Sequence, residues 1–134
     1  MRIFLVENHP DTLTYLRRFL ERAGHEVETA RTVAEALREL PAKSPDVLLA
    51  DLGLPDGDGW SLLEQLGSAR PPLAIAMSGH GSAADCARSK AAGFQEHLIK
   101  PFLPDDLERA LRQASPASSD PPEGGNAEKV ETPG

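Results

Sequence analysis

Short apolar runs separated by longer segments with helical spacing constrain this fold more than any other feature of the sequence. The runs at residues 3–6, 47–50 and 73–77 are too short for helices and do not alternate with polar residues. Strands that are buried on both faces of a parallel sheet have this pattern. Residues 25–30 and 94–99 complete the set of predicted strands. Because helix-like segments separate the strands, we predict an α/β fold with helices on both faces of a parallel sheet.

Start and stop signals for helices lie between the predicted strands. Pro10 suits a first helical turn, and Gly24 suits a stop. Thr32 and Glu35 form a plausible capping box, and Ser82 is a candidate cap for a later helix. The expected helices cover residues 10–23, 33–40, 60–66, 83–92 and 104–113.

Composition limits the cellular compartment and the partners. The 134 residues have a length typical of one domain, and the formal net charge is −7. An acidic surface disfavours nonspecific binding to nucleic acid and to anionic membranes. The single cysteine permits neither an intrachain disulfide nor a cysteine-based metal cluster, and no apolar run approaches the roughly 18 residues that span a bilayer. We therefore expect a cytoplasmic protein that binds neither nucleic acid nor membranes.

The composition changes sharply near residue 114. From 114 to 134 the chain is rich in Ser, Pro, Gly, Asp and Glu, and such a stretch buries too little apolar surface to offset its ordering entropy. We predict a folded domain at residues 1–113 and a disordered acidic tail at 114–134. The tail is too short and too polar for a DNA-binding output domain.

Groups suited to phosphoryl chemistry follow four of the predicted strands. They are Glu7 and Asn8, then Asp51, then Ser78 with Gly79 and His80, and finally Lys100 with Pro101. In an open parallel sheet, ligands bind beyond the carboxyl ends of the strands, so these groups should meet at one edge. A carboxylate there is a candidate nucleophile for an acyl phosphate, with Mg²⁺, a lysine and a hydroxyl to balance the negative charge.

Each of these residues also has an ordinary explanation when taken alone. An acid at a strand end such as Asp51 is often a helix cap or a solvated loop residue. Ser78 suits a turn, and Lys100 suits a solvated surface. The functional interpretation therefore depends on the joint pattern, in which separate strand ends supply complementary groups.

Four motifs in combination resemble the receiver domain of two-component response regulators, over residues 1–113. They are Leu-Val-Glu-Asn at 5–8, Asp-Leu-Gly-Leu-Pro-Asp at 51–56, Met-Ser-Gly at 77–79 and Lys-Pro-Phe at 100–102. The resemblance implies a flavodoxin-like, doubly wound sheet of five parallel strands in the order 2-1-3-4-5 with five helices.

The resemblance also implies a role for each matching residue. Asp51 matches the phosphoacceptor, and Ser78 matches the switch hydroxyl that binds the phosphoryl group. The remaining matches are Glu7, Asn8 and the backbone carbonyl of Gly53 as Mg²⁺ ligands beside Asp51, Gly79 and Lys100 as phosphoryl-binding residues, and a cis peptide bond between Lys100 and Pro101.

Two positions depart from the family pattern. Asn8 lies where the family usually has a metal-binding aspartate, so one negative charge is missing and we expect weaker Mg²⁺ binding. His97 lies where the family usually has a Tyr or Phe that swings inward with the switch hydroxyl. A switch role for His97 and an exposed position on an edge strand are both consistent with the sequence.

Three functional classes remain open at this stage. The leading hypothesis is a phosphorylated switch whose donor is a histidine kinase or histidine phosphotransfer protein and whose output is a contact with a downstream protein. The alternative is a non-phosphorylated pseudo-receiver that acts as a binding adaptor, which Asn8 favours. A phosphohydrolase of the dehalogenase type has a second aspartate two residues after its nucleophile, where this chain has Gly53. We therefore expect no enzyme activity beyond the protein's own phosphotransfer and autodephosphorylation.

Overall fold

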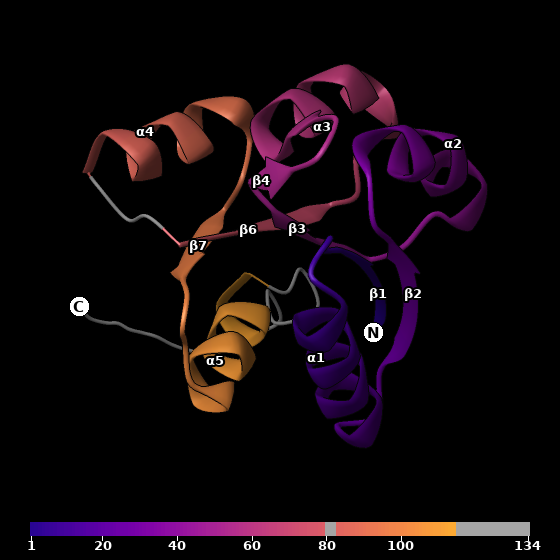
Figure 1. The fold of residues 1–134 in the computed structure, drawn as a ribbon, viewed down its shortest axis with the longest axis vertical. Coiled ribbons are helices and arrows are strands. Elements are labelled where there is room, and N and C mark those ends of the chain that lie inside the picture. The colour runs from indigo at the N-terminus through magenta and orange to yellow at the C-terminus, as the bar shows by residue number, and fades with distance from the viewer. Residues whose placement is uncertain (80–82, 115–134) are drawn as a thin grey trace, which may run out of the picture.

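Five parallel strands form the central sheet in the order β2-β1-β3-β6-β7 (Figure 1). They are β1 (Arg2–Val6), β2 (Glu26–Ala30), β3 (Val47–Asp51), β6 (Leu73–Ser78) and β7 (Glu96–Ile99). The computed structural model describes residues 1–79 and 83–114, and every neighbouring pair in this sheet is parallel. Taken along the chain these are strands one to five, so the predicted order 2-1-3-4-5 is confirmed.

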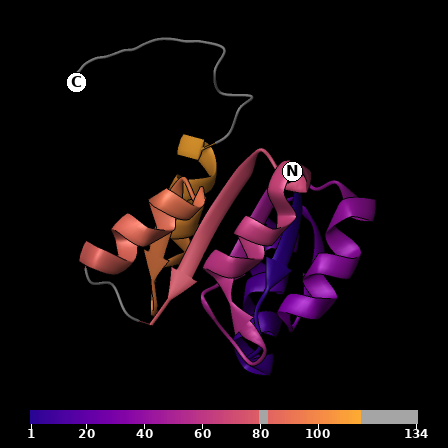
Figure 2. The ribbon, with the colours of Figure 1, turned by 90° about the horizontal axis from the view of Figure 1, so that it is seen from above.

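Helices cover both faces of the sheet, as the sequence predicts. One face carries α1 (Pro10–Arg22) and α5 (Pro104–Ala114), and the other carries α2 (Val33–Lys43), α3 (Gly59–Leu66) and α4 (Ala83–Ala92) (Figure 1). Figure 2 views the molecule from above, with α2, α3 and α4 lying in front of the sheet. The layers are therefore helix, sheet and helix, with the sheet buried in the middle.

Alternate residues of the central strands supply two separate cores. In β1, Ile3 and Leu5 pack with α1 and α5, whereas Phe4 and Val6 pack with α2 and α3. This split follows from the two-residue period of a strand. The same alternation continues in β3 and β6, and each of these central strands is buried throughout. The continuous apolar runs in the sequence therefore reflect burial on both faces.

Helix starts are held by side chains as well as by backbone hydrogen bonds. Thr32 Oγ1 accepts from the backbone N–H of Glu35 at 3.0 Å, as the predicted capping box requires. The Glu35 carboxylate, however, accepts from the N–H of Arg31 and not from that of Thr32. Asp56 adds a second cap from a distant loop, because its carboxylate accepts from the N–H groups of Val33 and Ala34.

Several boundaries differ from those predicted from the sequence. The loop after β3 contains a two-stranded antiparallel sheet, β4 (Gly53–Leu54) and β5 (Gly57–Asp58), where only turns were expected. A short 3₁₀ helix, η1 (Gly67–Ala69), follows α3. Strand β7 is shorter than predicted at its start, and α2 continues past Pro41, which lies in its last turn, where the lost N–H costs one hydrogen bond.

The described residues do not cover every prediction. Helix α5 ends at Ala114, one residue beyond the predicted end of the folded domain. The proposed cap at Ser82, the strand-end residue His80 and the predicted tail beyond Ala114 lie outside the described residues. Within residues 1–79 and 83–114, no helix combines the length and apolar character needed to cross a membrane.

Candidate functional site

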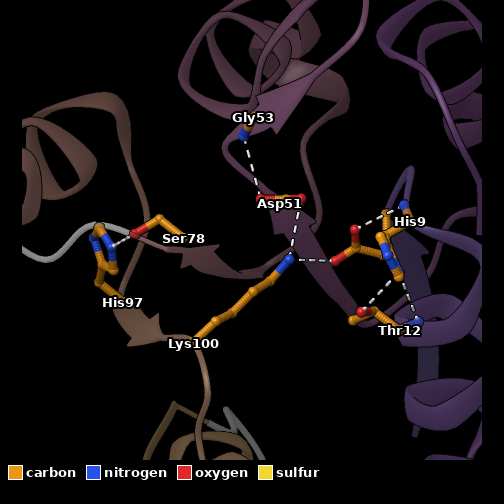
Figure 3. A network of polar contacts seen from close by, with 8 residues as sticks. His9, Thr12, Asp51, Gly53, Ser78, His97 and Lys100 are labelled. Carbon is orange, nitrogen blue, oxygen red and sulfur yellow. Dashed lines mark hydrogen bonds and ion pairs between the residues drawn. The ribbon is translucent and has the colours of Figure 1, made fainter.

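Three charged residues from separate strand ends are in direct contact at the carboxyl edge of the sheet. Lys100 follows β7, and its Nζ lies 2.6 Å from Oε1 of Glu7, which follows β1. The same Nζ lies 3.1 Å from Oδ2 of Asp51, the last residue of β3 (Figure 3). We call Glu7, Asp51 and Lys100 the ion cluster. Residues that are 93 and 49 positions apart in sequence thus meet at the edge that the strand-end argument selects.

The two carboxylates of the ion cluster are buried, so they depend on Lys100 for stabilisation of their charge. Glu7 is 1% exposed and Asp51 is 9% exposed, so both carboxylates have lost most of their contact with water. Burial lowers the pKa of Lys100, but its hydrogen bond to Glu7 and the negative charges of Asp51 and Glu7 outweigh burial and raise that pKa above its usual value. One ammonium facing two carboxylates leaves the edge attractive to a further cation.

Asp51 is oriented by the backbone as well as by Lys100. Its Oδ1 accepts from the N–H of Gly53 at 3.2 Å, while its Oδ2 contacts Lys100. The loop passes close behind it, because a β-carbon added at Gly59 would lie 2.9 Å from the Asp51 carbonyl oxygen. Glycine at position 59 therefore lets the start of α3 approach the end of β3.

A pocket of about 460 Å³ opens beside the Asp51 carboxylate. Its lining residues are Asp51, Leu52, Gly53, Trp60, Ser78, Gly79, Asp85 and Lys100. Among the described residues, a β-carbon added at Gly79 would meet no atom within 4 Å, so it would extend into open space. The pocket has room for a small anion beside the carboxylate and the ammonium.

The candidate metal ligands are oxygen atoms, which are the donors that Mg²⁺ prefers. Glu7 and Asp51 supply carboxylates at the same edge, and Glu7 Oε2 also accepts from the N–H of His9 at 3.0 Å. Asn8 follows Glu7 at an exposed position, and its backbone carbonyl oxygen accepts from the Arg31 guanidinium. Across the described residues, no three His, Cys, Asp or Glu side chains gather as a metal-binding group. A cation here would therefore depend on two carboxylates together with amide and backbone oxygens.

Ser78 and His97 are joined by a hydrogen bond across the end of the sheet. Ser78 Oγ lies 2.7 Å from His97 Nε2 (Figure 3). His97 is thus half-buried on the edge strand β7, with its ring directed toward Ser78, so it is not fully exposed there, and a switch role for it stays a prediction. Burial lowers the pKa of His97, and the nearby Asp85 carboxylate offsets part of that shift. The Lys100–Pro101 peptide bond beside them is cis, the isomer that the resemblance implies.

The structure adds functional candidates that the sequence argument missed. Trp60 lines the pocket and donates from Nε1 to Ser89 Oγ at 2.9 Å, and Ser89 Oγ lies 2.9 Å from His97 Nδ1. Trp60 is the only tryptophan in the sequence, and it lies shortly after the loop that follows Asp51, so the sequence did carry a signal for it. Ser89 gave no such signal, because a serine within a helix is usually a solvated residue.

The fold and this edge together define a doubly wound α/β protein built around one buried, lysine-paired aspartate. A family model described as the response regulator receiver domain matches residues 3–112. This chain belongs to that family.

Individual relatives agree with the family match. The chain is similar to the KDP operon transcriptional regulatory protein KdpE of Escherichia coli K12, with 33% identity over 84% of the chain and 50% of that protein. It thus spans half the length of that relative. It is also similar to an uncharacterised 14.6 kDa protein of Leptolyngbya boryana, with 33% identity over 84% of this chain and 88% of that one.

A solved structure shows the same likeness in three dimensions. The CheY-like receiver domain protein of Methanospirillum hungatei JF-1 matches with a TM-score of 0.78 and 32% identity. The match covers 84% of this chain and 90% of that one. Sequence and fold therefore point to the same family.

Proposed function

We propose that this protein is a phosphoryl-accepting signalling switch in which Asp51 takes a phosphoryl group from a histidine kinase or a histidine phosphotransfer protein. The contact of Lys100 Nζ with Glu7 at 2.6 Å and Asp51 at 3.1 Å supports this role most directly. A buried carboxylate that lies beside an ammonium and a pocket is the combination that formation of an acyl phosphate needs.

The chemistry follows from the groups around Asp51. A carboxylate oxygen of Asp51 attacks phosphorus, and the bond between phosphorus and the donor histidine nitrogen breaks. That nitrogen keeps the electron pair and takes up a proton from solvent, while Asp51 becomes an acyl phosphate. Lys100 is placed to pair with a phosphoryl oxygen, and Ser78 and the backbone of Gly79 line the pocket that receives the group.

Mg²⁺ is the cofactor that we propose for this step, held by the carboxylates of Glu7 and Asp51, the Asn8 amide and the Gly53 carbonyl. Bound Mg²⁺ would offset the repulsion between the Asp51 carboxylate and the incoming phosphoryl group. Because Asn8 contributes no charge, we propose weaker binding than at a site with another aspartate at that position.

The signal would leave the protein through a protein contact. A phosphoryl group adds nearly two negative charges beside Ser78 and Lys100. These charges shift the equilibrium between two arrangements of the elements that carry the two residues. Helix α4 exposes Arg88 and Lys90, and β7 exposes Ile99, so charge and apolar surface lie together next to those elements. We propose that a downstream protein binds there, and that Gly53 two residues after Asp51 leaves the protein without turnover on external substrates.

Acetyl phosphate with Mg²⁺, followed by intact-mass measurement, tests the proposal. The wild type is expected to gain one phosphoryl group, and Asp51→Ala is expected to gain none. Asp11→Asn is a matched control, because Asp11 is an exposed acid in the first turn of α1 near the same edge. Labelling of Asp51→Ala as strong as that of the wild type would reject Asp51 as the acceptor.

Asn8 supports a second candidate function, a non-phosphorylated binding adaptor. The position next to Glu7 carries an exposed amide and no negative charge, which weakens the metal site on which phosphotransfer depends. In this case neither the wild type nor Asn8→Asp would be labelled at saturating Mg²⁺. Labelling of Asn8→Asp alone would show that the missing charge silences the site.

A further inference from the structure

A continuous set of hydrogen bonds connects α3 to the end of β6 through α4 and β7. Trp60 Nε1 lies 2.9 Å from Ser89 Oγ, Ser89 Oγ lies 2.9 Å from His97 Nδ1, and His97 Nε2 lies 2.7 Å from Ser78 Oγ. We call these residues the His97 network. Three hydrogen bonds thus link residues from four different elements. The last of them, drawn in Figure 3, joins His97 to Ser78, which lines the pocket beside Asp51.

The direction of the first bond is fixed by chemistry. An indole N–H is a donor and has no acceptor capacity, so Ser89 Oγ must accept from Trp60. Ser89 is 0% exposed, so its own hydroxyl hydrogen also needs a partner inside the protein. Among the described residues, the hydrogen bonds of Ser89 Oγ run to Trp60 and His97. The Ser89 hydrogen is therefore satisfied when it is donated to Nδ1 of His97.

The three protonation states of His97 differ in how well they fit this constraint. A neutral ring with its proton on Nδ1, or an imidazolium with protons on both nitrogens, would donate to Ser89 Oγ and leave the buried Ser89 hydrogen without an acceptor. A neutral ring with its proton on Nε2 accepts from Ser89 and donates to Ser78. This state alone satisfies Trp60, Ser89 and His97 together.

We propose that Ser89, oriented by Trp60, is a positioning residue that holds His97 in the Nε2–H tautomer with its proton directed at the Ser78 oxygen. The hydrogen of Ser78 is then donated to a group other than His97. A phosphoryl oxygen is an acceptor, so this is the arrangement that binding to phosphorylated Asp51 would use. That consequence rests on the proposed function, whereas the tautomer itself does not.

Charged groups around His97 set the conditions for the test. The negative charge of Asp85 in α4 raises the pKa of His97 and offsets part of the effect of burial. A depression beside His97 is also lined by Glu96 of β7 and by Asp106 and Arg109 of α5. Burial lowers the pKa of His97, which favours the neutral ring at pH 7.5. Measurements at this one pH and constant ionic strength keep those neighbouring charges constant between variants.

Nitrogen-15 NMR of the histidine ring, on unphosphorylated full-length protein at pH 7.5, tests the tautomer directly. We expect a protonated Nε2 and an unprotonated, hydrogen-bonded Nδ1, with this form exceeding the other by about tenfold or more, a ratio that about 1.4 kcal/mol supports. A predominant Nδ1–H form or an imidazolium would overturn the proposal. Because no phosphodonor is present, this outcome is independent of whether Asp51 is phosphorylated.

Variants separate positioning from simple packing. Ser89→Ala is expected to move the His97 Nδ1 resonance to that of a ring nitrogen that accepts no hydrogen bond, and Ser89→Thr is expected to restore it. Trp60→Phe keeps an aromatic ring without the N–H, so the Ser89 hydroxyl is free to rotate and the tautomer ratio should fall. An unchanged resonance in Ser89→Ala, or an unchanged ratio in Trp60→Phe, would overturn the role given to that residue.

Arg88→Gln is the matched control for these variants. The Arg88 guanidinium lies 4.3 Å from the centre of the Trp60 ring, next to Ser89 in the same helix, but it is not part of the network. Its removal disturbs the contact between α3 and α4 while it leaves the three hydrogen bonds in place. The His97 resonances are expected to stay unchanged, and a change as large as that in Ser89→Ala would contradict a specific role for Ser89.

Discussion

The ion cluster and the His97 network lie at the same end of the sheet, yet they are stabilised in different ways. The cluster pairs one ammonium with two buried carboxylates, so its energy depends on charge and on any cation or anion that arrives. The network joins neutral side chains through donors and acceptors that satisfy one another in one arrangement. A change in charge at Asp51 therefore acts on the cluster directly and on the network through Ser78, which lines the same pocket.

This difference indicates that the two regions have different functions. The cluster contains the proposed phosphoryl acceptor Asp51, its partner Lys100 and the proposed Mg²⁺ ligand Glu7, which come from three strand ends. The network extends from the same pocket through β7 and α4 to α3, and α4 and β7 carry the surface at which we propose that a partner binds. The following predictions test whether the two regions are as distinct as their chemistry indicates.

The largest effect on stability is expected for Lys100→Met, which leaves Glu7 buried without its ammonium. Loss of one partner of a buried pair costs about 3–5 kcal/mol, and because Lys100 is partly exposed we expect a loss of about 2–3 kcal/mol in the free energy of unfolding. Urea unfolding monitored by circular dichroism measures it. Lys43→Met is the matched control, since its ion pair with Glu28 is exposed and should contribute less than about 1 kcal/mol. Equal losses for both variants would contradict a special role for burial in the cluster.

His97→Phe is expected to cost about 1–2 kcal/mol in the free energy of unfolding, because the buried hydroxyl of Ser89 loses its acceptor. The same urea experiment measures this loss. Adding Ser89→Ala to His97→Phe removes the unsatisfied hydroxyl, so part of the stability should return. If the double variant is as unstable as the sum of the single variants, the two residues do not act as one network.

Asn8→Asp adds a negative charge next to Glu7 of the ion cluster, whereas Lys100→Met removes a positive charge from it. One added negative charge about 4 Å from a divalent cation is worth about 2 kcal/mol at a water-like dielectric, so Mg²⁺ should bind about thirtyfold more tightly. Fluorescence of Trp60, the only tryptophan and a residue of the pocket, reports the titration at fixed pH. Equal affinities for the parent and Asn8→Asp would show that position 8 does not contribute to a metal site.

The smallest effect is a pH dependence that comes from the network. The pKa of His97 is lowered in the folded protein from an ordinary value of 6.5, so the unfolded chain takes up this proton first as the pH falls. Stability is therefore lost as the pH decreases from 6.5 toward the folded pKa, and it is retained above 6.5. His97→Phe should flatten the slope of unfolding free energy against pH in this window.

His25 titrates in the same window and provides the comparison for that slope. Its pKa is also lowered, by burial and by the positive N-terminus, so His25→Gln should flatten the slope independently of His97→Phe. A slope that is unaffected by His97→Phe would contradict burial of the neutral ring within the network.

The two regions also differ in how far the sequence predicts them. Apolar runs fix the strands, and a parallel sheet brings their carboxyl ends together, so Glu7, Asp51 and Lys100 are predictable as neighbours from their positions after the strands. The strand order itself came from the resemblance to a family and is confirmed by the structure.

The network was not predictable in the same way. Its contacts depend on how α3 and α4 are rotated and packed over the sheet, which the spacing of Trp60 and Ser89 does not encode. The sequence left His97 with two interpretations, and the inward one follows only when Ser78 and Ser89 are placed on both sides of its ring. The β4–β5 pair and the cap from Asp56 to α2 were missed for a related reason, since both depend on the conformation of the loop after β3.

The central claim is that Asp51 carries the phosphoryl group, and chemical mapping of the labelled residue tests it most directly. Hydride reduction converts an aspartyl phosphate to homoserine, so peptide sequencing by mass spectrometry identifies the modified position after treatment with acetyl phosphate and Mg²⁺. We predict homoserine at position 51 in the wild type and in Asp11→Asn. Homoserine at another position, or no homoserine under conditions in which a known receiver domain is labelled, would contradict the account.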